Sequence, residues 1–388
     1  MNLGVSKMAT ANTSLTPQQM NAAALGAILS TSLVRMQQIF SSTINPANGN
    51  VINVVPRNVG LILGFFVDVT LNVTNGATNT AALTKLGAAN ALSNITFVDY
   101  ANYTRHNTTG AHVHLLNTAR GGRPFGMSRA LINYPVAYGD NWTVVSAPTS
   151  LAGSATGTVT MRYYIPVAYG RNTLDGAVYA NITNAQAALN LTINNTPFVS
   201  TGDATQALYS GNTGSITSAT VTVYQHYRDQ LPIASNGQPI LPQLSLLNAY
   251  MLQSSAVSSI TAKQDYTVPY TNFRQYLSTF SIFDNGGTLN AGSDVNYWAL
   301  RSANFTDIFK MSPQEVALMS RSLIGTDFPD GVYYFDHRQQ PIQTNQYGNM
   351  DLVLNASTAN TGAQLLMSYE MLGQINLIAQ AGSLPAGG

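Results

Sequence analysis

Apolar and polar residues alternate along several stretches of this chain. In one of them Phe65, Val67, Val69, Leu71 and Val73 are apolar, and the even-numbered positions from 68 to 74 are polar. A period of two residues is typical of a β-strand with one face in a core and the other toward solvent. The same pattern, or a shorter β-like run, predicts further strands at 142–145, 159–165, 189–193, 221–227, 280–283, 332–335, 352–354 and 365–371.

Clusters of Asn and Gly separate these runs, for example at 75–76, 236–237 and 285–287. Such clusters are typical of turns. Many strands without regular strand–helix alternation favour antiparallel sandwiches or barrels over a parallel sheet. The strand count suits jelly rolls. We therefore expect an all-β fold of two tandem eight-stranded antiparallel jelly rolls, with an N-terminal α-helix and short inserted helices.

Three segments carry helix signals. Thr16, Pro17 and Gln19 fit a capping box with proline in the first turn. The second helix is predicted from about 173 to 189, and the third from a second capping box at 312–315 to about Gly325. The first helix is expected to run to about residue 40, because apolar residues recur at three- and four-residue steps. This apolar stripe consists of Leu25, Leu29, Leu33, Met36 and Phe40.

The order of strands, a helix and a final pair of strands occurs twice, which indicates two similar halves. A proline-rich stretch at 231–242 is the predicted joint. We expect an N-terminal arm with an amphipathic helix at 1–45, a first jelly roll at 46–235, and a second jelly roll with a C-terminal tail at 236–388.

The arm has three interpretations. Its apolar part, 22–34, is too short and too interrupted for a membrane span, which needs about 20 apolar residues. It also lacks a convincing cleavage site for a signal peptide. The helix could pack on its own domain, dock on a neighbouring subunit or lie on a membrane surface, and the sequence leaves these open.

The chain carries little charge. It has 17 Lys or Arg and 16 Asp or Glu, which is 9% of its residues and a net charge of +1. An ordinary soluble domain has roughly 25% charged residues. With 45% hydrophobic residues, disorder is excluded. Four lysines do not support binding of nucleic acid through its phosphates. A net charge this close to zero favours association between copies.

The few charges are unevenly distributed, and cysteine is absent. Residues 1–67 contain Lys7, Arg35 and Arg57 but no acidic residue, which leaves 14 basic against 16 acidic residues in the remainder. The absence of cysteine excludes disulfides, thiolate metal sites and cysteine nucleophiles. The arm is therefore the basic part of an otherwise slightly acidic chain.

His112 and His114 are the strongest candidates for metal ligands. On a strand they would share a face and reach one ion, with His106 nearby. A jelly-roll metal site of the cupin type also needs a downstream glutamate, and no glutamate precedes Glu315. We therefore expect a structural histidine pair, with no metal and no cofactor.

Other candidate motifs are weaker. The segment 126–130 loosely resembles a nucleophile elbow but lacks the surrounding strand–helix unit. Arg120, Arg123 and Arg129 could bind an anion, although a solvated loop or a contact between subunits is the favoured interpretation. Residues 284–287 with Asp294 lack the acidic spacing of a calcium loop and are read as a turn. No catalytic, cofactor-binding or metal site is predicted, so we do not expect an enzyme.

Several segments, in order from about residue 46 to 370, resemble the double jelly-roll major capsid proteins of tectiviruses, tailless icosahedral bacteriophages with an internal membrane. The resemblance is strongest in YLSTFSIFDNGG at 276–287, NAGSDVNY at 290–297 and TDFPDGVYY at 326–334. Weaker similarity lies at 58–60, 110–119, 229–232 and 347–349, and the two ends, 1–15 and 372–388, are least similar.

The resemblance implies a homotrimeric, pseudo-hexagonal capsomer that tiles an icosahedral shell in the virion. It implies neighbouring capsomers, vertex (penton) proteins and minor capsid proteins as partners, no direct contact with nucleic acid, and an N-terminal helix near the internal membrane. We expect these contacts to be made by the apolar stripe, which consists of Leu25, Leu29, Leu33, Met36 and Phe40, either with neighbouring capsomers or with the membrane. Deleting 1–45 is expected to leave soluble trimers that form no shells.

Two other functional classes remain as alternatives. One is a secreted or surface β-sandwich that binds carbohydrate through Asn, Tyr and Trp side chains. The other is a metal-dependent jelly-roll enzyme that uses His112 and His114. Neither class requires a stable trimer.

Overall fold

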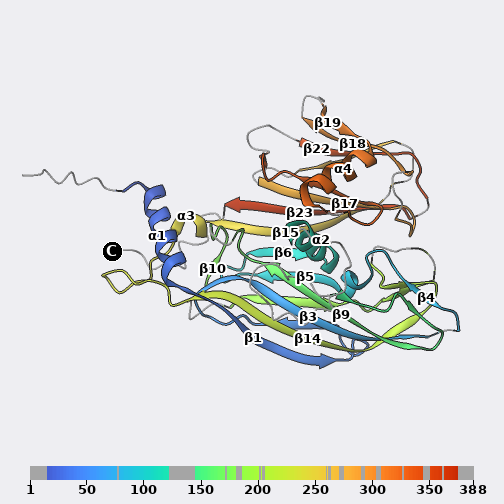
Figure 1. The fold of residues 1–388 in the computed structure, drawn as a ribbon, viewed down its shortest axis with the longest axis horizontal. Coiled ribbons are helices and arrows are strands. Elements are labelled where there is room, and N and C mark those ends of the chain that lie inside the picture. Colours follow the sequence, from blue (N-terminus) through green and yellow to red (C-terminus); the bar gives the residue numbers. More distant parts are fainter. Residues whose placement is uncertain are drawn as a thin grey trace, which may run out of the picture.

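The computed structural model is mostly β-strand and has few helices (Figure 1). It describes residues 15–76, 78–121, 145–170, 173–180, 186–200, 202, 206–258, 260, 264–270, 275–289, 293–302, 307–325, 327–343, 350–360 and 362–374. The helices are α1 Pro17–Thr31, α2 Gly110–Gly121, α3 Gln243–Leu246 and α4 Pro313–Ile324, with a 3₁₀ turn, η1, at Gly87–Ala91.

Eight main strands build the first half. They are β1 Leu33–Ile44, β2 Val51–Val54, β3 Leu61–Asn75, β5 Leu92–Val98, β6 Thr104–Thr108, β9 Thr156–Pro166, β11 Ala188–Ile193 and β14 Gly214–Asp229. One sheet has the order β1-β14-β3-β9, extended by β7 Val145–Ser146 and by β10 Val178–Tyr179, which pairs with β3. A small separate sheet consists of β4 Ala81–Leu83, β8 Ser150–Leu151, β12 Phe198–Val199 and β13 Tyr209–Ser210.

Eight main strands also build the second half. They are β15 Asn248–Ser258, β16 Asp265–Pro269, β17 Gln275–Asp284, β18 Val295–Ser302, β19 Asp307–Met311, β20 Val332–Asp336, β22 Met350–Ala356 and β23 Gln364–Gln374. One sheet has the order β16-β22-β18-β19. The other strands lie in the order β15-β23-β17-β20, with the short β21 Ile342–Gln343 pairing with β17.

Strand pairing is nested in the same way in both halves. In the first half β5 pairs with β6, β3 with β9, β2 with β11, and β1 with β14. In the second half β18 pairs with β19, β17 with β20, β16 with β22, and β15 with β23. Each half is thus a long hairpin rolled into two sheets, which is a jelly roll. The expected tandem of eight-stranded antiparallel jelly rolls is confirmed.

The two jelly rolls share a sheet and a core. The sheet β2-β11-β5-β6 of the first half continues into β15-β23-β17-β20 of the second through parallel pairing of β6 with β15. The largest hydrophobic cluster contains Val67 and Leu71 of β3, Leu116 of α2, and Phe280 and Tyr334 of the second half. The halves are therefore parts of one packed unit, and β23 and β17 are covered on both faces.

The predicted strands lie where the alternation placed them. In β3 the five apolar residues from Phe65 to Val73 are fully buried, and the polar positions between them are half-buried. Val145 begins β7, whereas 142–144 lie outside the described residues.

The predicted N-terminal helix begins at its capping box but ends earlier than expected. As predicted, the Thr16 hydroxyl accepts a hydrogen bond from the Gln19 backbone N–H, and the Gln19 side chain accepts one from the Thr16 backbone N–H. The extension to Phe40 is wrong: α1 ends at Thr31, and Leu33–Ile44 is the strand β1, paired with β14. The hydroxyls of Thr31 and Ser32 bond to the carbonyls of Ala27 and Ile28 and so compete with further helical turns. Extended pairing with β14 then outweighs the helical spacing of the apolar residues.

The second helix is not where the sequence placed it. No helix occurs in the described residues between 173 and 189, where β10 and the start of β11 lie instead. Gly176 has a φ of +79°, and a Cβ there would lie 2.6 Å from the backbone nitrogen of Tyr250. The helix of the first half is α2, at 110–121. It follows β6 as α4 follows β19, so the repeated order holds with a different helix.

The third predicted helix, α4, is confirmed with its capping box. Ser312 accepts a hydrogen bond from the Glu315 backbone N–H at 3.3 Å, and the Glu315 carboxylate accepts one from the Ser312 N–H at 2.7 Å. The variant Ser312→Ala is expected to lower the free energy of unfolding by about 1 kcal/mol, measured by urea denaturation. The exposed Ser322→Ala on the same helix is the control. Equal losses in both variants would contradict a specific cap.

Candidate functional site: a polar seam between the two halves

Polar side chains that are buried or partly buried bridge the two jelly rolls beside α2. We define the polar seam as Arg105, His106, Thr108, His112 and Arg120 of the first half with Tyr250, Ser254, Ser278, Ser368 and Glu370 of the second. The first set comes from β6 and α2, and the second from β15, β17 and β23. The nested pairing of both halves brings these strands together at the β6–β15 joint.

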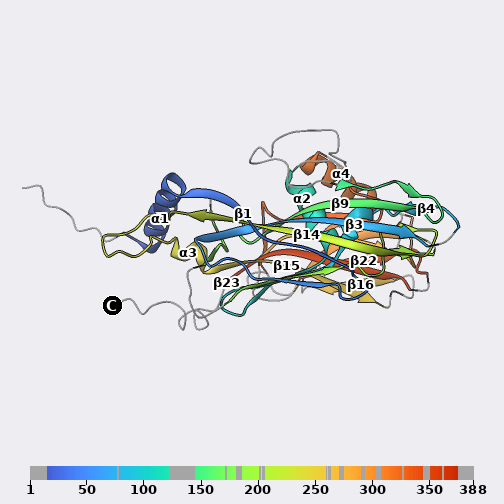
Figure 2. The same cartoon turned by 90° about the horizontal axis from the view of Figure 1, so that it is seen from below.

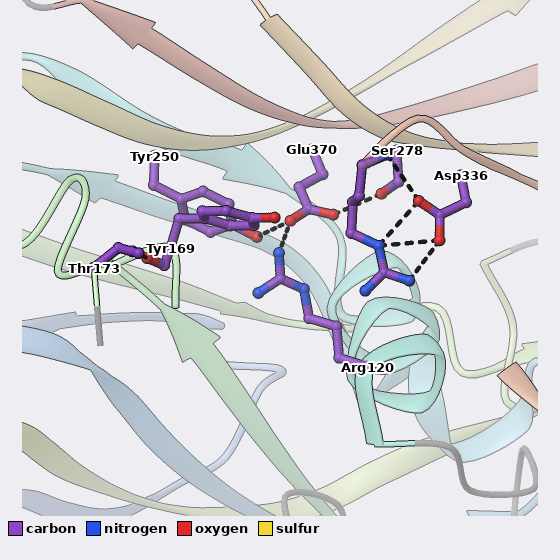
Figure 3. A network of polar contacts seen from close by, with 8 residues as sticks. Arg120, Tyr169, Thr173, Tyr250, Ser278, Asp336 and Glu370 are labelled. Carbon is purple, nitrogen blue, oxygen red and sulfur yellow. Dashed lines mark hydrogen bonds and ion pairs between the residues drawn. The ribbon is translucent and has the colours of Figure 1, made fainter. Parts of the chain in front are cut away.

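Glu370 is the centre of the larger cluster (Figure 3). Its carboxylate is 1% exposed and accepts hydrogen bonds from the Tyr250 hydroxyl at 2.9 Å and the Ser278 hydroxyl at 2.7 Å. Arg120, at the end of α2, forms an ion pair with the same carboxylate. The guanidinium carbon of Arg120 lies 5.1 Å from the ring centroid of Tyr169 and 5.4 Å from that of Tyr250. The cluster thus joins α2 to three strands of the second half.

A second ion pair lies next to this cluster, also visible in Figure 3. The guanidinium of Arg338 donates to the carboxylate of Asp336. These hydrogen bonds raise the pKa of Arg338 above its usual value. Both residues of this pair belong to the second half.

A chain of hydroxyls connects α2 to β23. The Thr108 hydroxyl lies 2.6 Å from Nδ1 of His112 and 2.8 Å from the Ser254 hydroxyl. Ser254 in turn lies 2.8 Å from the Ser368 hydroxyl. Inside the protein these polar groups are shielded from water, and each has a hydrogen-bond partner on another element.

His106 lies in the joint itself. Its Nδ1 accepts the backbone N–H of Leu252 at 3.1 Å, at the point where β6 pairs with β15. Burial lowers the pKa of both His106 and His112 to about 3. Burial also lowers the pKa of His114 to about 4. The seam therefore contains neutral imidazoles at neutral pH.

Two further basic side chains make polar contacts. The buried Arg105 pairs with Asp99 at 2.7 Å and also donates to the carbonyl of Gly176, both within the first half. Lys85 of the first half donates to the carbonyl of Leu289 and lies 3.5 Å from Asp330, both in the second half. The hydrogen bonds and ion pairs of the polar seam therefore hold the two halves of the chain in a fixed orientation.

The strand assumed for His112 and His114 is wrong, because both lie on α2. Residues i and i+2 of an α-helix are about 200° apart around its axis, so the imidazoles of His112 and His114 do not share a face. His112 bonds to Thr108 instead. In the described part of the chain, no three His, Cys, Asp or Glu side chains are grouped to hold a metal ion.

The other candidate residues are scattered. Of the three arginines considered for an anion, Arg120 lies in the seam, whereas Arg123, Arg129 and the segment 126–130 lie outside the described residues. The turn predicted at 284–287 is confirmed: the Asn285 N–H bonds to the carbonyl of Thr288, and the Gly287 N–H to the carboxylate of Asp284.

Residues of the apolar stripe on the arm lie in three environments, and one of them, Phe40 of β1, packs against the main core. Leu25 packs with the buried Ile28 against a small cluster at one end of the molecule, and α3 contacts α1 there. Leu33 and Met36 belong to β1 and are exposed. Figures 1 and 2 place α1 at the end of the molecule opposite β4. Within the described residues, no helix has the length and hydrophobicity needed to cross a membrane.

Glu370 is the residue that sequence reasoning missed. It lies in the strand predicted from Leu365, Met367, Tyr369 and Met371, on the side of the strand opposite these four residues. The first jelly roll covers that side. One signal was available: Glu370 is one of two glutamates in the chain, and it is flanked by apolar residues.

Two family models match the chain in tandem. The one described as P3 major capsid protein N-terminal matches residues 7–231, and the one described as P3 major capsid protein C-terminal matches residues 247–385. The major capsid protein P3 of Enterobacteria phage PRD1 is 42% identical over 364 residues, which is 92% of this chain and 92% of that protein. The resemblance to tectivirus capsid proteins is thereby confirmed.

Solved viral capsid structures share the fold. The STIV MCP superposes with a TM-score of 0.63 at 11% identity, over 91% of this chain and 100% of the other. The major capsid protein P2 of bacteriophage PM2 superposes with a TM-score of 0.50 at 8% identity, over 89% and 98%. On the P3 matches, the chain belongs to the family of P3 viral major capsid proteins and is a structural protein of the outer capsid shell, not an enzyme.

Proposed function

We propose that three copies of this chain form a pseudo-hexagonal capsomer, and that these capsomers tile an icosahedral shell over an internal membrane. The observation that carries the proposal is the nested strand pairing, repeated in both halves of the chain. Three copies of a two-lobed subunit place six similar lobes around one threefold axis. A hexagonal outline allows such capsomers to pack side by side in a flat facet.

The same proposal divides the chain near its proline-rich stretch, at 231–242. The two family models stop at 231 and resume at 247, which supports a joint there. Vertex (penton) and minor capsid proteins are the proposed partners at the edges of the facets. No direct contact with nucleic acid is proposed, because the chain has four lysines.

The N-terminal arm is proposed to face inward, toward neighbouring capsomers and the membrane. The segment Pro17–Thr31 contains no charged residue. The helix is anchored through Ile28 and through Asn21, which bonds to α3. Leu15 and Met20, near its start, are 54% and 52% exposed. An apolar end on an anchored helix is suited to contact with another surface.

The test uses the double variant Leu15→Asp with Met20→Asp. It changes exposed residues only, so capsomers should keep a mass of three times 41.4 kDa in light scattering. The yield of shells in electron microscopy should fall at least about tenfold, because a charged arm binds an apolar surface poorly. This variant replaces deletion of 1–45, since that deletion would remove β1.

The matched control is Gln18→Asp with Ser30→Asp, which adds the same charge at exposed polar positions of α1. It should assemble normally. A monomeric mass for the unaltered protein would contradict the trimer. Normal shells from the Leu15 and Met20 variant would contradict only the role of the arm.

A further inference from the structure

The chain contains four Asn-Gly pairs, at 48–49, 75–76, 236–237 and 285–286. In such a pair the backbone nitrogen of the glycine can attack the side-chain amide of the asparagine, because glycine has no Cβ to shield that nitrogen and adopts many backbone conformations. In a folded protein the reaction also depends on the hydrogen bonds of both groups and on how easily the segment opens. The four pairs share one local sequence and differ in their surroundings.

Two of the pairs are held within the fold. Asn75 is fully buried, and its side-chain nitrogen donates to three backbone carbonyls at 2.8, 3.0 and 3.1 Å. The nitrogen that would attack it, that of Gly76, donates to the carbonyl of Thr213 at 2.8 Å. Asn285 is 2% exposed, and its side-chain oxygen accepts the Asn360 N–H at 2.6 Å. Several hydrogen bonds must therefore open before either asparagine can react.

The pair at 236–237 is accessible but engaged. Asn236 is exposed in the hairpin that follows the first jelly roll. Its side-chain oxygen accepts the Gln238 N–H at 3.0 Å, and the Gly237 N–H donates to the carbonyl of Ala234 at 2.9 Å. Both hydrogen bonds lie inside the turn itself, and a Cβ on Gly237 would meet nothing within 4 Å. Opening of the turn alone would free this pair.

The pair at 48–49 is the least constrained. Asn48 is exposed in the turn between β1 and β2. The Gly49 N–H lies 3.4 Å from the carbonyl oxygen of Pro46, which is long for a hydrogen bond. A Cβ on Gly49 would also meet nothing within 4 Å. The attacking nitrogen is therefore held less firmly than that of Gly76 or Gly237.

We propose that Asn48 is a site of spontaneous deamidation, at which the folded protein modifies itself without an enzyme. The Gly49 nitrogen loses its proton and attacks Cγ of Asn48. The new C–N bond closes a succinimide ring, and the side-chain nitrogen leaves as ammonia. Water then adds to one of the two ring carbonyls and opens the ring to aspartate or isoaspartate. In isoaspartate the main chain passes through Cγ and is one atom longer.

The modification changes both charge and chain length at a corner of the fold. Residues 1–67 contain no acidic residue, so the new carboxylate is the first negative charge there. The corner leads from the sheet of β1 to the sheet of β2. It is anchored just beyond the site, because Asn50 donates to the Ile193 carbonyl at 3.0 Å and accepts the Ile193 N–H at 2.8 Å. The extra atom of isoaspartate must be accommodated between β1 and this anchor, so old and newly made subunits differ at this corner.

The test incubates the purified protein at pH 8 in water labelled with heavy oxygen. Opening of the succinimide takes up one oxygen atom from water, so the label marks the product in mass spectrometry. Cleavage at Lys and Arg places each pair in a different peptide. The peptide of Asn48 should gain label first and that of Asn236 next. Labelling of Asn75 and Asn285 should be at least about tenfold slower, since several hydrogen bonds must open there first.

The matched control is the same incubation in urea. The four pairs lose their different surroundings when the chain unfolds, so their rates should become similar. The variant Asn48→Gln should remove the early label from its peptide, because glutamine would have to close a larger ring. This variant should fold normally, since the altered side chain is exposed. In the unaltered protein the label should appear more slowly at pH 6, because the attacking nitrogen must lose its proton.

The outcomes are decisive for this inference alone. Equal rates at all four pairs in the folded protein, or labelling of Asn75 before Asn48, would overturn it. A peptide of Asn48 that gains label in urea but not in the folded protein would overturn it as well. Rates that stay unequal in urea would assign the differences to sequence and not to the fold, which also contradicts the inference. None of these results bears on the proposed trimer.

Discussion

Replacing Glu370 by glutamine is expected to lower the free energy of unfolding by about 3 kcal/mol, since removal of one partner from a buried ion pair costs about 3–5 kcal/mol. We expect a loss at the lower end of this range, because the Arg120 side chain is 26% exposed and keeps its contacts with Tyr169 and Tyr250. Glutamine has nearly the shape of glutamate, so the loss comes from charge rather than volume. The measurement is guanidinium denaturation of the purified protein at pH 7.

A double-mutant cycle separates the pair from its surroundings. We expect Arg120→Met to be destabilising and the combination with Glu370→Gln to cost less than the two single losses together. The exposed pair of Arg301 with Asp307, at 2.9 Å, is the matched control. Arg301→Met should cost at most about 1 kcal/mol. A loss below about 1 kcal/mol in Glu370→Gln would show that the seam is held by packing alone.

Mild acid is expected to destabilise the protein steeply between pH 6.5 and about pH 4. Burial holds the pKa of His106 and His112 at about 3, and that of His114 and His337 at about 4. In the unfolded chain these groups titrate near 6.5. Below that value the unfolded state binds protons that the folded state does not, so stability falls as the pH falls.

The expected change of the unfolding free energy with pH is large. Each histidine contributes about 1.4 kcal/mol per pH unit, so four together contribute roughly 5 kcal/mol per unit. Urea denaturation at pH 7, 6 and 5 measures the slope, and His337→Gln should reduce it by about a quarter. Protonation of His106 would also remove the acceptor for the Leu252 N–H, so the β6–β15 joint should exchange its amide hydrogens first. Constant stability from pH 7 to pH 5 would contradict the prediction.

Much of the fold could be predicted from residue patterns, because one face of each long outer strand is in contact with solvent. In β3 the alternation from Phe65 to Val73 identifies the strand, its length and its inward face. Capping boxes at Thr16 and Ser312 correctly mark the starts of two helices, since capping depends on residues close in sequence. Local chemistry determines these features, so local sequence is sufficient.

The seam could not be predicted in the same way. Ser278, Ser368 and Glu370 have the polar character of a solvent-facing side, and they are buried only because the first jelly roll covers them. The helical spacing of Leu33, Met36 and Phe40 was similarly misleading, because β14 supplies an extended partner from far along the chain. Both errors arise where contacts between distant segments outweigh local preference.

The nested pairing of strands also determines an order in time. Leu33 pairs with Asp229, so at roughly 5–20 residues per second β1 waits about 10–40 s during synthesis before its partner strand exists. Meanwhile β5 can pair with β6, and β3 with β9. A newly made chain therefore folds from the inside of each rolled hairpin outward. In the first half, β1 is therefore the strand that remains unpaired longest during synthesis.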